Sequence, residues 1–260
     1  MAEHHNLYQL AVYYDVALCR DVTREVEFMT ALYRRHTGRE LQSVLEIACG
    51  PGYHTRAFAR RGVRAVGLDL RPEMLELAQE KAAADGAPVT WLAADMRHFQ
   101  LDATVDMAFC MFDGMDALSA NEDVVQHFRC IAQYLTPGGL YLVDLTHPRD
   151  CAYHQYGSFR YAGERDGIQV EIVWGVNQPH FDLITGVAHS QLEIRINDHG
   201  HRMVIHDAAD ERLFMPQELV LLAELSGALR VVAWHGNYDV NQSLDDSPAS
   251  QRMVAVLQKL

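Results

Sequence analysis

The stretch VLEIACGPG, residues Val44–Gly52, decides how this chain is expected to fold. Its first part, Val44–Ile47, is predicted to form a buried strand, and the periodic apolar pattern of Tyr53–Arg61 predicts a helix. Gly50 and Gly52 therefore lie in the turn between the strand and the helix. Because glycine has no Cβ, a ligand can approach the backbone there, and the helix can present its free N–H groups. We interpret the turn as a ligand site, with a simple tight corner as the alternative.

A carboxylate at the end of the next strand supports this interpretation. Residues Arg64–Leu68 are predicted to form a second strand that leads into Asp69, 17 residues after Gly52. An acid at this place in a nucleotide-binding fold accepts hydrogen bonds from the hydroxyls of a ribose. A dinucleotide site would have a third glycine where the chain has Thr55, and would not need Glu46 inside the strand. These differences disfavour nicotinamide and flavin cofactors.

Residues Glu46–Gly52, EIACGPG, resemble the first motif of the class I S-adenosylmethionine-dependent methyltransferases. Ala48 takes the place of the family's first glycine. The family also has an acid after its second strand, matched by Asp69, and an Asp-Met or similar pair after its third, matched by Asp95 and Met96. The resemblance implies the α/β fold of the family, with a Rossmann-like seven-stranded sheet, and its cofactor, S-adenosyl-L-methionine.

The resemblance covers residues 40–147 and extends more weakly into the C-terminal part. Ligands of open parallel sheets lie at the carboxyl ends of the strands, so the loop after a predicted strand at Val105–Cys110 should touch cofactor and acceptor. N-terminal segments of the family commonly fold over the cofactor and carry a tyrosine, which makes Tyr14 the first candidate and Tyr8 the second, with simple packing as the alternative. The predicted cofactor-binding residues are Tyr14, Glu46, Ala48, Gly50, Gly52, Asp69, Leu70, Met74, Asp95, Met96, Met111 and Phe112.

The C-terminal half changes from alternating strands and helices to strands alone between about residues 158 and 214. Turn signals within this stretch predict antiparallel hairpins. We interpret it as an inserted β cap, resembling that of small-molecule N-methyltransferases, whose acceptors include amino-sugar nucleotides and glycine-like amines. The predicted division is an N-terminal lid and cofactor-binding core in 1–150, the antiparallel β cap in 151–214, and the completion of the core by an antiparallel strand pair in 215–260.

Composition narrows the classes of partner and location. The net charge of −13, from 35 acidic and 22 basic residues, disfavours nucleic acid, because phosphate contacts need clustered Lys and Arg.

The five cysteines include no Cys-x-x-Cys pair and follow no secretory signal, which favours a cytoplasmic location. No uncharged run approaches the ~20 residues that span a bilayer, so no membrane association is expected. The 14 histidines form no closed ligand set, so no metal is expected. Exposed edges in the cap favour a homodimer as a hypothesis.

The expected chemistry requires few catalytic groups. Methyl transfer from a sulfonium is an in-line displacement, to which the positioning of the reactants can contribute on the order of 7–11 kcal/mol. An amine acceptor only has to lose a proton, so one base suffices. His147, directly after the fifth predicted strand, is the first candidate for this base, ahead of Tyr14, Asp113 and Asp144. Capping of the strand end is the alternative role for His147.

The sequence thus predicts an enzyme that transfers a methyl group from S-adenosyl-L-methionine to a small molecule, with an amine as the favoured acceptor. The loop after the fourth strand lacks the Asp-Pro-Pro-Tyr or Asn-Pro-Pro-Tyr pattern of enzymes that methylate nucleobases or glutamine. O-methylation of a hydroxyl or a carboxylate is the alternative, because the sequence of the cap does not decide between them. A protein that keeps the cofactor without methyl transfer, and a protein-binding module, are further alternatives.

Overall fold

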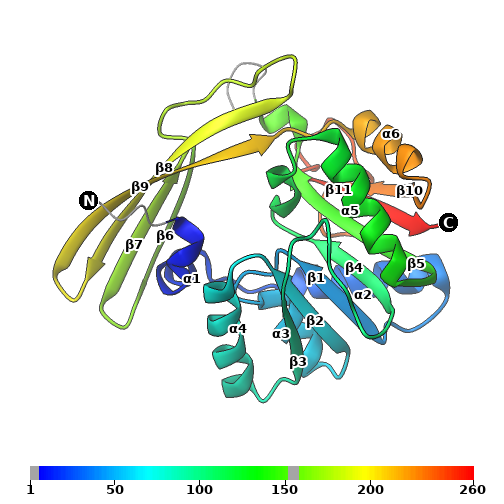
Figure 1. The fold of residues 1–260 in the computed structure, drawn as a ribbon, viewed down its shortest axis with the longest axis horizontal. Helices are drawn as coiled ribbons and strands as arrows, with labels where there is room; N and C mark the ends of the chain where they lie inside the picture. The colour runs from blue at the N-terminus through cyan, green and yellow to red at the C-terminus, as the bar shows by residue number, and fades with distance from the viewer. Residues whose placement is uncertain (1–5, 152–157) are drawn as a thin grey trace.

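The computed structural model describes residues 6–151 and 158–260, and the structural statements below concern these residues. Their strands form a seven-stranded sheet and a separate four-stranded antiparallel sheet, which lies apart from the larger one in Figure 1. The strand order of the larger sheet is β10-β11-β5-β4-β1-β2-β3. This architecture confirms the predicted α/β fold, with a Rossmann-like seven-stranded sheet and an antiparallel β cap.

In the larger sheet, the first five strands of the chain pair in parallel, whereas β11 runs antiparallel to both of its neighbours. The last two strands thus form the antiparallel pair that the sequence predicts. The strand order reverses at β1, so a ligand site is expected at the carboxyl ends of β1 and β4. The strands of this sheet are β1 (Ser43–Ile47), β2 (Arg64–Asp69), β3 (Val89–Ala93), β4 (Val105–Cys110), β5 (Leu135–Thr146), β10 (Leu229–His235) and β11 (Arg252–Lys259).

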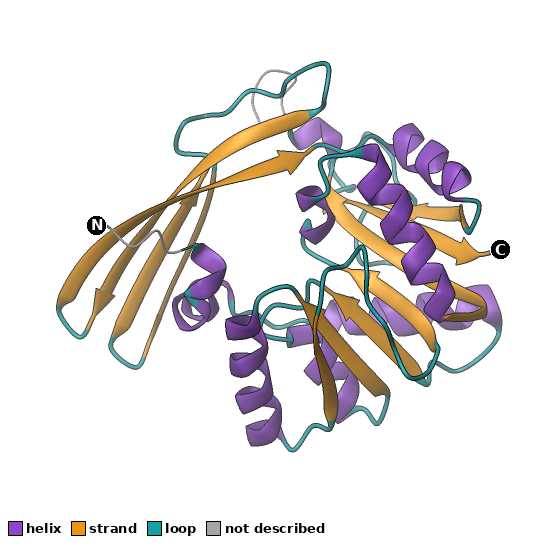
Figure 2. Ribbon diagram, viewed as in Figure 1, coloured by secondary structure: helices purple, strands orange, loops and turns teal. Residues whose placement is uncertain are grey.

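Helices cover both faces of the larger sheet (Figure 2). Met29 and Phe58, from α2 and α3, pack on one face, and Phe128 and Leu219, from α5 and α6, pack on the other. Because successive side chains from Met107 to Cys110 of β4 enter these two cores in alternation, this part of the strand is a continuous apolar run. The helices of the core are α2 (Thr23–Thr37), α3 (Tyr53–Arg60), α4 (Pro72–Asp85), α5 (Asn121–Tyr134) and α6 (Pro216–Ser226).

The N-terminal helix α1 (Ala11–Leu18) packs against the cap sheet, on the side of the cap nearer the core in Figure 1. Val16 contributes to a small core with Ile172 and Ile194 of the cap. A Cβ at Gly163 would lie 1.9 Å from the carbonyl oxygen of Val16, so only glycine allows this close approach. The strands of the cap are β6 (Phe159–Arg165), β7 (Ile168–Trp174), β8 (Val187–Asp198) and β9 (His201–Arg212).

A buried carboxylate, Asp15, connects α1 to two helices of the core and to the cap sheet. The hydroxyl of Tyr53 in α3 donates to Asp15 Oδ1 over 2.9 Å, and Arg165 of β6 donates to Oδ2 over 2.5 Å. Lys81 Nζ of α4 lies 2.8 Å from the same oxygen. Burial alone would raise the pKa of Asp15, but hydrogen bonds from Lys81, Arg165 and Tyr53 lower it below its usual value. The ionised carboxylate therefore holds the N-terminal helix, the core and the cap together.

Replacing Asp15 by Asn should loosen this junction, because Lys81 and Arg165 would lose their shared anion. Removal of one partner of a buried ion pair costs about 3–5 kcal/mol, and the partial exposure of both cations places the expected loss near the lower end. Urea unfolding would measure the loss, and hydrogen exchange would show faster exchange of backbone amides over residues 7–18. Glu27→Gln, which removes an exposed carboxylate of α2, is the control. Equal exchange in both variants would contradict this account.

Candidate active site

A cavity of about 380 Å³ lies where the carboxyl ends of β1, β2 and β4 meet the N-terminal segment. Most of the residues that the sequence predicts for the cofactor line it. Those residues are Tyr14, Glu46, Ala48, Gly50, Asp69, Leu70, Met74, Asp95, Met96, Met111 and Phe112. Tyr8, the second tyrosine candidate, lines the cavity as well. Two predicted site residues, Gly52 and His147, are not among the lining residues.

The turn after β1 has a left-handed backbone at three positions. The φ angles of Ala48, Gly50 and Gly52 are 52°, 51° and 70°. Left-handed conformation costs about 1–2 kcal/mol for an L-residue with a Cβ, so Ala48 is strained where the family has glycine. A Cβ at Gly50 would meet nothing within 4 Å, which leaves open space in front of this peptide. Gly50 therefore suits the predicted close approach of a ligand.

Gly52 lies against a side chain of the core and has no room for a Cβ. A Cβ at this position would lie 2.4 Å from the indole ring of Trp91 in β3. The same ring lies 2.4 Å from the Cβ position of Gly67 in β2. The space left by Gly52 is thus filled by a core side chain, which gives this glycine a role in packing, while its role in cofactor binding stays a prediction.

The carboxylate of Asp69 is oriented by backbone donors on both sides. Gly50 N donates to Oδ2 over 2.8 Å, and Arg71 N donates to Oδ1 over 2.9 Å. Burial raises the pKa of Asp69, although these backbone hydrogen bonds oppose the shift. Each carboxylate oxygen can accept a second hydrogen bond, so the pair of oxygens can still receive two hydroxyl groups. This geometry suits the diol of a ribose.

Glu46 has its two oxygens bonded to the first turn of α3. His54 donates from Nδ1 to Oε1 over 2.9 Å, and Thr55 N donates to Oε2 over 2.8 Å. The hydroxyl of Thr55 forms a further short hydrogen bond with Oε2. Glu46 therefore satisfies N–H groups that a helix leaves free at its start, and fixes the helix to the strand.

Asp95 and Met96, the pair after β3, are also fixed by neighbours. Arg97 donates to Asp95 from Nη2 over 2.6 Å and from Nε over 3.0 Å, and these bonds lower the pKa of Asp95. His127 Nδ1 donates to the carbonyl oxygen of Met96 over 2.8 Å, and Nε2 accepts from Tyr141 Oη over 2.6 Å. Burial lowers the pKa of His127 to about 4, so its ring is neutral. The hydrogen bonds from Arg97 and His127 therefore fix the position of this segment of the cavity wall.

A second cavity of about 250 Å³ lies beside the first, between the loop after β4, the N-terminal segment and the β cap. The two cavities adjoin, because they share six lining residues, which are Tyr8, Tyr14, Leu18, Phe112, Gly114 and Ala117. Aromatic side chains from the cap and the N-terminus form much of its wall. They are Tyr8, Tyr14, Phe159, Tyr161 and Trp174.

The loop between the two cavities has two strained residues. Phe112 and Asp113 have φ angles of 56° and 63°, which few residues other than glycine adopt. Phe112 N donates to Asp144 Oδ2 over 2.9 Å, and Arg252 donates to Asp144 Oδ1 over 2.8 Å and to Asp113 Oδ2 over 3.0 Å. Strain of this kind persists only where surrounding contacts impose it. Asp113 and Asp144, two of the predicted base candidates, are thus both bonded to Arg252, which sequence reasoning did not assign to the site.

Tyr14 lines both cavities, but it cannot act as a base near neutral pH. Burial, together with the charge of Asp69, raises the pKa of its phenol well above the usual value. The neutral hydroxyl can donate a hydrogen bond to a ligand in either cavity. The structure therefore supports Tyr14 as a contact residue and argues against its predicted role as a base.

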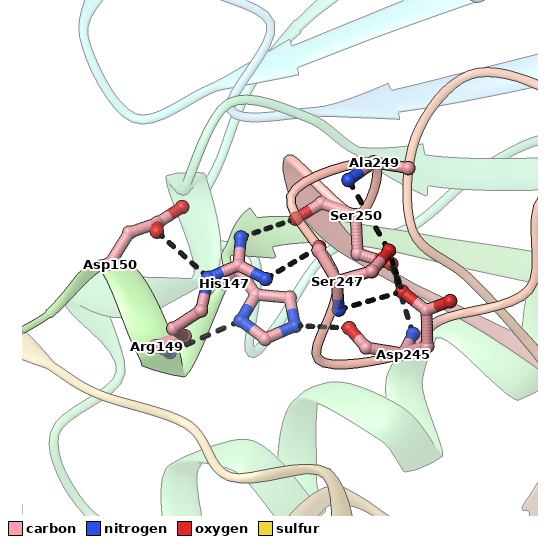
Figure 3. A network of polar contacts seen from close by, with 7 residues as sticks. All are labelled: His147, Arg149, Asp150, Asp245, Ser247, Ala249 and Ser250. Carbon is pink, nitrogen blue, oxygen red and sulfur yellow. Dashed lines mark hydrogen bonds and ion pairs between the residues drawn. The ribbon is translucent and has the colours of Figure 1, made fainter.

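His147 lies outside both cavities and is fully engaged by the backbone (Figure 3). Its Nδ1 accepts from Arg149 N over 3.1 Å, and its Nε2 donates to the carbonyl oxygen of Asp245 over 3.0 Å. Arg149 donates to the carbonyl oxygens of Ser247 and Ser250 over 2.7 and 2.6 Å. Both residues thus anchor the loop before β11 to the end of β5. This geometry argues against His147 as the base and agrees with the alternative, a role at the strand end.

Comparison with known proteins decides the family of this part of the chain. Residues 44–139 match the family model described as "Methyltransferase domain". We refer to residues 44–139 below as the methyltransferase domain, after the family model that they match. The resemblance of Glu46–Gly52 to the class I methyltransferase motif is thereby confirmed.

Relatives of the methyltransferase domain are known in several bacteria. The protein YqeM of Bacillus subtilis is 32% identical over 103 residues, which are 39% of this chain and 41% of YqeM. A dTDP-3-amino-3,6-dideoxy-alpha-D-glucopyranose N,N-dimethyltransferase of Streptomyces fradiae is 29% identical over 125 residues, 48% of this chain and 47% of that protein. The chain thus spans about half the length of these curated relatives.

Solved structures match the fold beyond the methyltransferase domain. An S-adenosylmethionine-dependent methyltransferase from Clostridium acetobutylicum has a TM-score of 0.78 at 17% identity, covering 97% of this chain and 99% of its own. DesVI of Streptomyces venezuelae has a TM-score of 0.75 at 23% identity, covering 97% and 98%. CalS10 of Micromonospora echinaspora, an amino pentose methyltransferase solved with S-adenosylmethionine bound, has a TM-score of 0.71 at 18% identity, covering 100% and 99%. At these identities the matches show a shared fold.

Gly52→Ala should destabilise the methyltransferase domain through Trp91. Left-handed strain costs about 1–2 kcal/mol, and the clash with the indole should add about 1–3 kcal/mol. Gly86→Ala is the matched control, since Gly86 also has a positive φ of 64° but nothing within 4 Å of its Cβ position. Urea unfolding should show the larger loss for Gly52→Ala, and Trp91→Leu should recover part of it. Equal losses in the two alanine variants would show that the ring moves aside freely.

His147→Asn separates the two roles considered for this residue. If His147 anchors the loop, the variant loses two hydrogen bonds worth about 0.5–1.5 kcal/mol each, and its stability falls accordingly. Turnover at saturating substrate should then fall by less than about tenfold, below what a general base contributes. Arg149→Gln, which removes bonds to the same loop, should behave alike. A drop beyond about a hundredfold for His147→Asn alone, with unchanged urea unfolding, would restore the catalytic role.

Proposed function

We propose that this protein transfers the methyl group of S-adenosyl-L-methionine to the nitrogen of a small-molecule amine. The observation that carries the proposal is the pair of adjoining cavities, about 380 and 250 Å³, with Tyr14, Phe112 and Gly114 in both walls. The first lies in the methyltransferase domain, and the second is bounded by the β cap. A methyl group passing from one to the other would cross at these shared residues.

The residues around the first cavity fit S-adenosyl-L-methionine. Asp69 would accept from the ribose hydroxyls with the oxygen positions that Gly50 and Arg71 leave open. The open space at Gly50 admits a ligand against the backbone, and Met74 and Leu70 offer apolar surface next to Asp69. When bound, the cofactor supplies an electrophilic methyl group on a sulfonium. The chain itself would orient the two reactants and exclude water.

An amine acceptor agrees better with the second cavity than a carboxylate does. Four of its lining residues are acidic and one is basic, so an anionic acceptor would meet a surface of like charge. The S. fradiae relative, an N,N-dimethyltransferase of an amino sugar, has a name that points to nitrogen as well. We therefore retain amino sugars among the proposed acceptors, with O-methylation of a hydroxyl as the second candidate.

The remaining proposals concern partners, location and domain division. A small-molecule acceptor without nucleic acid accords with the net charge of −13. In the described residues, no helix is long and apolar enough to cross a membrane. All five cysteines are free, which supports a cytoplasmic location in a reducing compartment. A homodimer, and the division at residues 150 and 214, are kept as proposals; sedimentation of the purified chain would test the dimer.

Cofactor binding tests the proposal directly. Isothermal titration of the full chain with S-adenosylhomocysteine should give heat, and Asp69→Ala should weaken binding by about ten- to a hundredfold, the effect of one charge-assisted hydrogen bond. Glu80→Gln on the exposed side of α4 should bind as the wild type does. Absence of heat with the wild-type chain would overturn the enzyme assignment. If binding is found, release of S-adenosylhomocysteine from S-adenosyl-L-methionine with a set of amine and hydroxyl acceptors would identify the reaction.

A further inference from the structure

The second cavity is lined by more acidic than basic side chains. The acidic residues are Asp113, Asp116, Asp210 and Glu211, and Arg252 is the basic one. The guanidinium of Arg252 is already bonded to Asp113 and to a further acid outside the lining, Asp144. It therefore contributes little positive charge to the rest of the cavity.

Two of the other acids are accounted for by their own neighbours. Asp210 is exposed and accepts from His189 Nδ1 over 2.8 Å. Glu211 is buried and accepts from the hydroxyl of Ser190 over 3.0 Å. These contacts give both residues roles within the cap, so the remaining acid of the cavity is Asp116.

Asp116 lies in the short 3₁₀ helix η2 (Gly114–Ala117) and is only 7% exposed. Its backbone N–H donates to the carbonyl oxygen of Asp113 over 3.0 Å. Among the hydrogen bonds and ion pairs of residues 6–151 and 158–260, however, none involves its carboxylate, whose oxygens are not among the fully buried atoms and border the cavity. Burying a carboxylate without a hydrogen-bond partner is costly, so such a group in a native structure calls for an explanation. Since the carboxylate borders an open cavity, a ligand is the natural source of the missing donor.

The surroundings of Asp116 favour a cation as that ligand. Burial raises the pKa of Asp116 well above its usual value, and the nearby charges of Asp113 and Glu211 raise it further. The charge of Arg252 lowers the pKa of Asp116, and that of Asp144 raises it. Asp116 in turn contributes to the raised pKa of the Cys110 and Cys151 thiols, although burial is the larger cause for both. A bound cation would offset this crowding of negative charge.

We infer that Asp116 binds the positively charged nitrogen of the acceptor, which is therefore a small protonated amine. The inference rests on the proposed function and specifies the substrate class of the second cavity. Aromatic rings of Tyr14, Tyr161 and Phe112 also line the cavity, and such rings attract cations through their faces. The buried indole Nε1 of Trp174 has no hydrogen-bond partner among the described residues and can donate to a hydroxyl of the same ligand.

The same carboxylate can remove the proton that blocks the reaction. A protonated amine has no free electron pair, so one N–H bond must break before the nitrogen can attack. The proton passes to Asp116, and the electron pair left on nitrogen forms the new N–C bond. The C–S bond of the donor breaks with its electron pair remaining on sulfur, and the proton of Asp116 leaves to water with the product. An acid whose pKa lies above the usual range is better suited to take this proton.

Binding of a matched pair of ligands tests the inference. The probes are 3-amino-3-deoxy-D-glucose and D-glucose, which differ in an ammonium against a hydroxyl group, titrated into the full chain with S-adenosylhomocysteine present. The wild type should bind the amino sugar about ten- to a hundredfold more tightly, as expected for one charge-assisted contact. In Asp116→Asn this preference should fall to about twofold or less, with the affinity for S-adenosylhomocysteine unchanged. Asp102→Asn, which removes an exposed carboxylate outside both cavities, should keep the preference.

Stability provides a second readout that separates a binding role from a structural one. Asp116→Asn removes a buried charge that has no partner in the described residues, so the melting temperature without ligand should stay the same or rise. A marked fall would indicate that the carboxylate supports the fold. A wild-type chain that binds S-adenosylhomocysteine but does not prefer the amino sugar would overturn this inference alone. A chain that does not bind S-adenosylhomocysteine would overturn the proposed function as well.

Discussion

The site depends on one buried cation shared by two acids. Arg252, at the start of β11, holds Asp113 and Asp144, although 139 residues separate it from Asp113 in the chain. Asp144 in turn accepts from the backbone of Phe112 and from the hydroxyl of Tyr238. Together these bonds keep Phe112 and Asp113 in a conformation that they would otherwise avoid. The wall between the two cavities therefore exists only when the last strand is in place.

The topology of the sheet explains how this contact arises. Because β11 inserts between β5 and β10 and runs antiparallel to β5, its first residue lies opposite Thr146, at the carboxyl end of β5. A strand added in parallel would place its first residue at the opposite edge of the sheet. The antiparallel strand thus places Arg252, close to the C-terminus, at the carboxyl ends of the parallel strands, where the loops of the methyltransferase domain meet.

The sequence was sufficient to predict the core and to name most of the predicted site residues that line the first cavity together, because those signals are local. Val105–Cys110 forms a strand whose residues Met107–Cys110 are buried on both faces, and Asp69 ends its strand at the expected place. Gly52 shows the limit of such reasoning. Its glycine signal was correct, but the neighbour that requires it, Trp91, is 39 residues away and could not be assigned from the pattern.

The residues of the second cavity were harder to find for a related reason. Asp116 stands in an ordinary acidic stretch, and its proposed role depends on two facts of the folded chain: it lines the second cavity, and no hydrogen bond among the described residues involves its carboxylate. Arg252 occurs in a segment whose only clear signal was a strand. His147 carried the strongest chemical signal of its neighbourhood, yet a backbone N–H two residues later and a carbonyl group 98 residues later occupy its ring. The residue type gives the chemistry that a side chain can perform, but its hydrogen-bond partners in the folded chain determine whether it is available to a ligand.

The packing of α1 connects the two cavities mechanically. This helix contributes Tyr14 to both of them, while Val16 is buried against β7 and β8 of the cap. Gly163 allows the helix and β6 to lie so close that one cannot shift far without the other. Asp15 then connects the same helix to Tyr53 and Lys81 of the methyltransferase domain. Helix α1 therefore couples the packing of the cap to that of the core, and the two cavities share the wall that it forms.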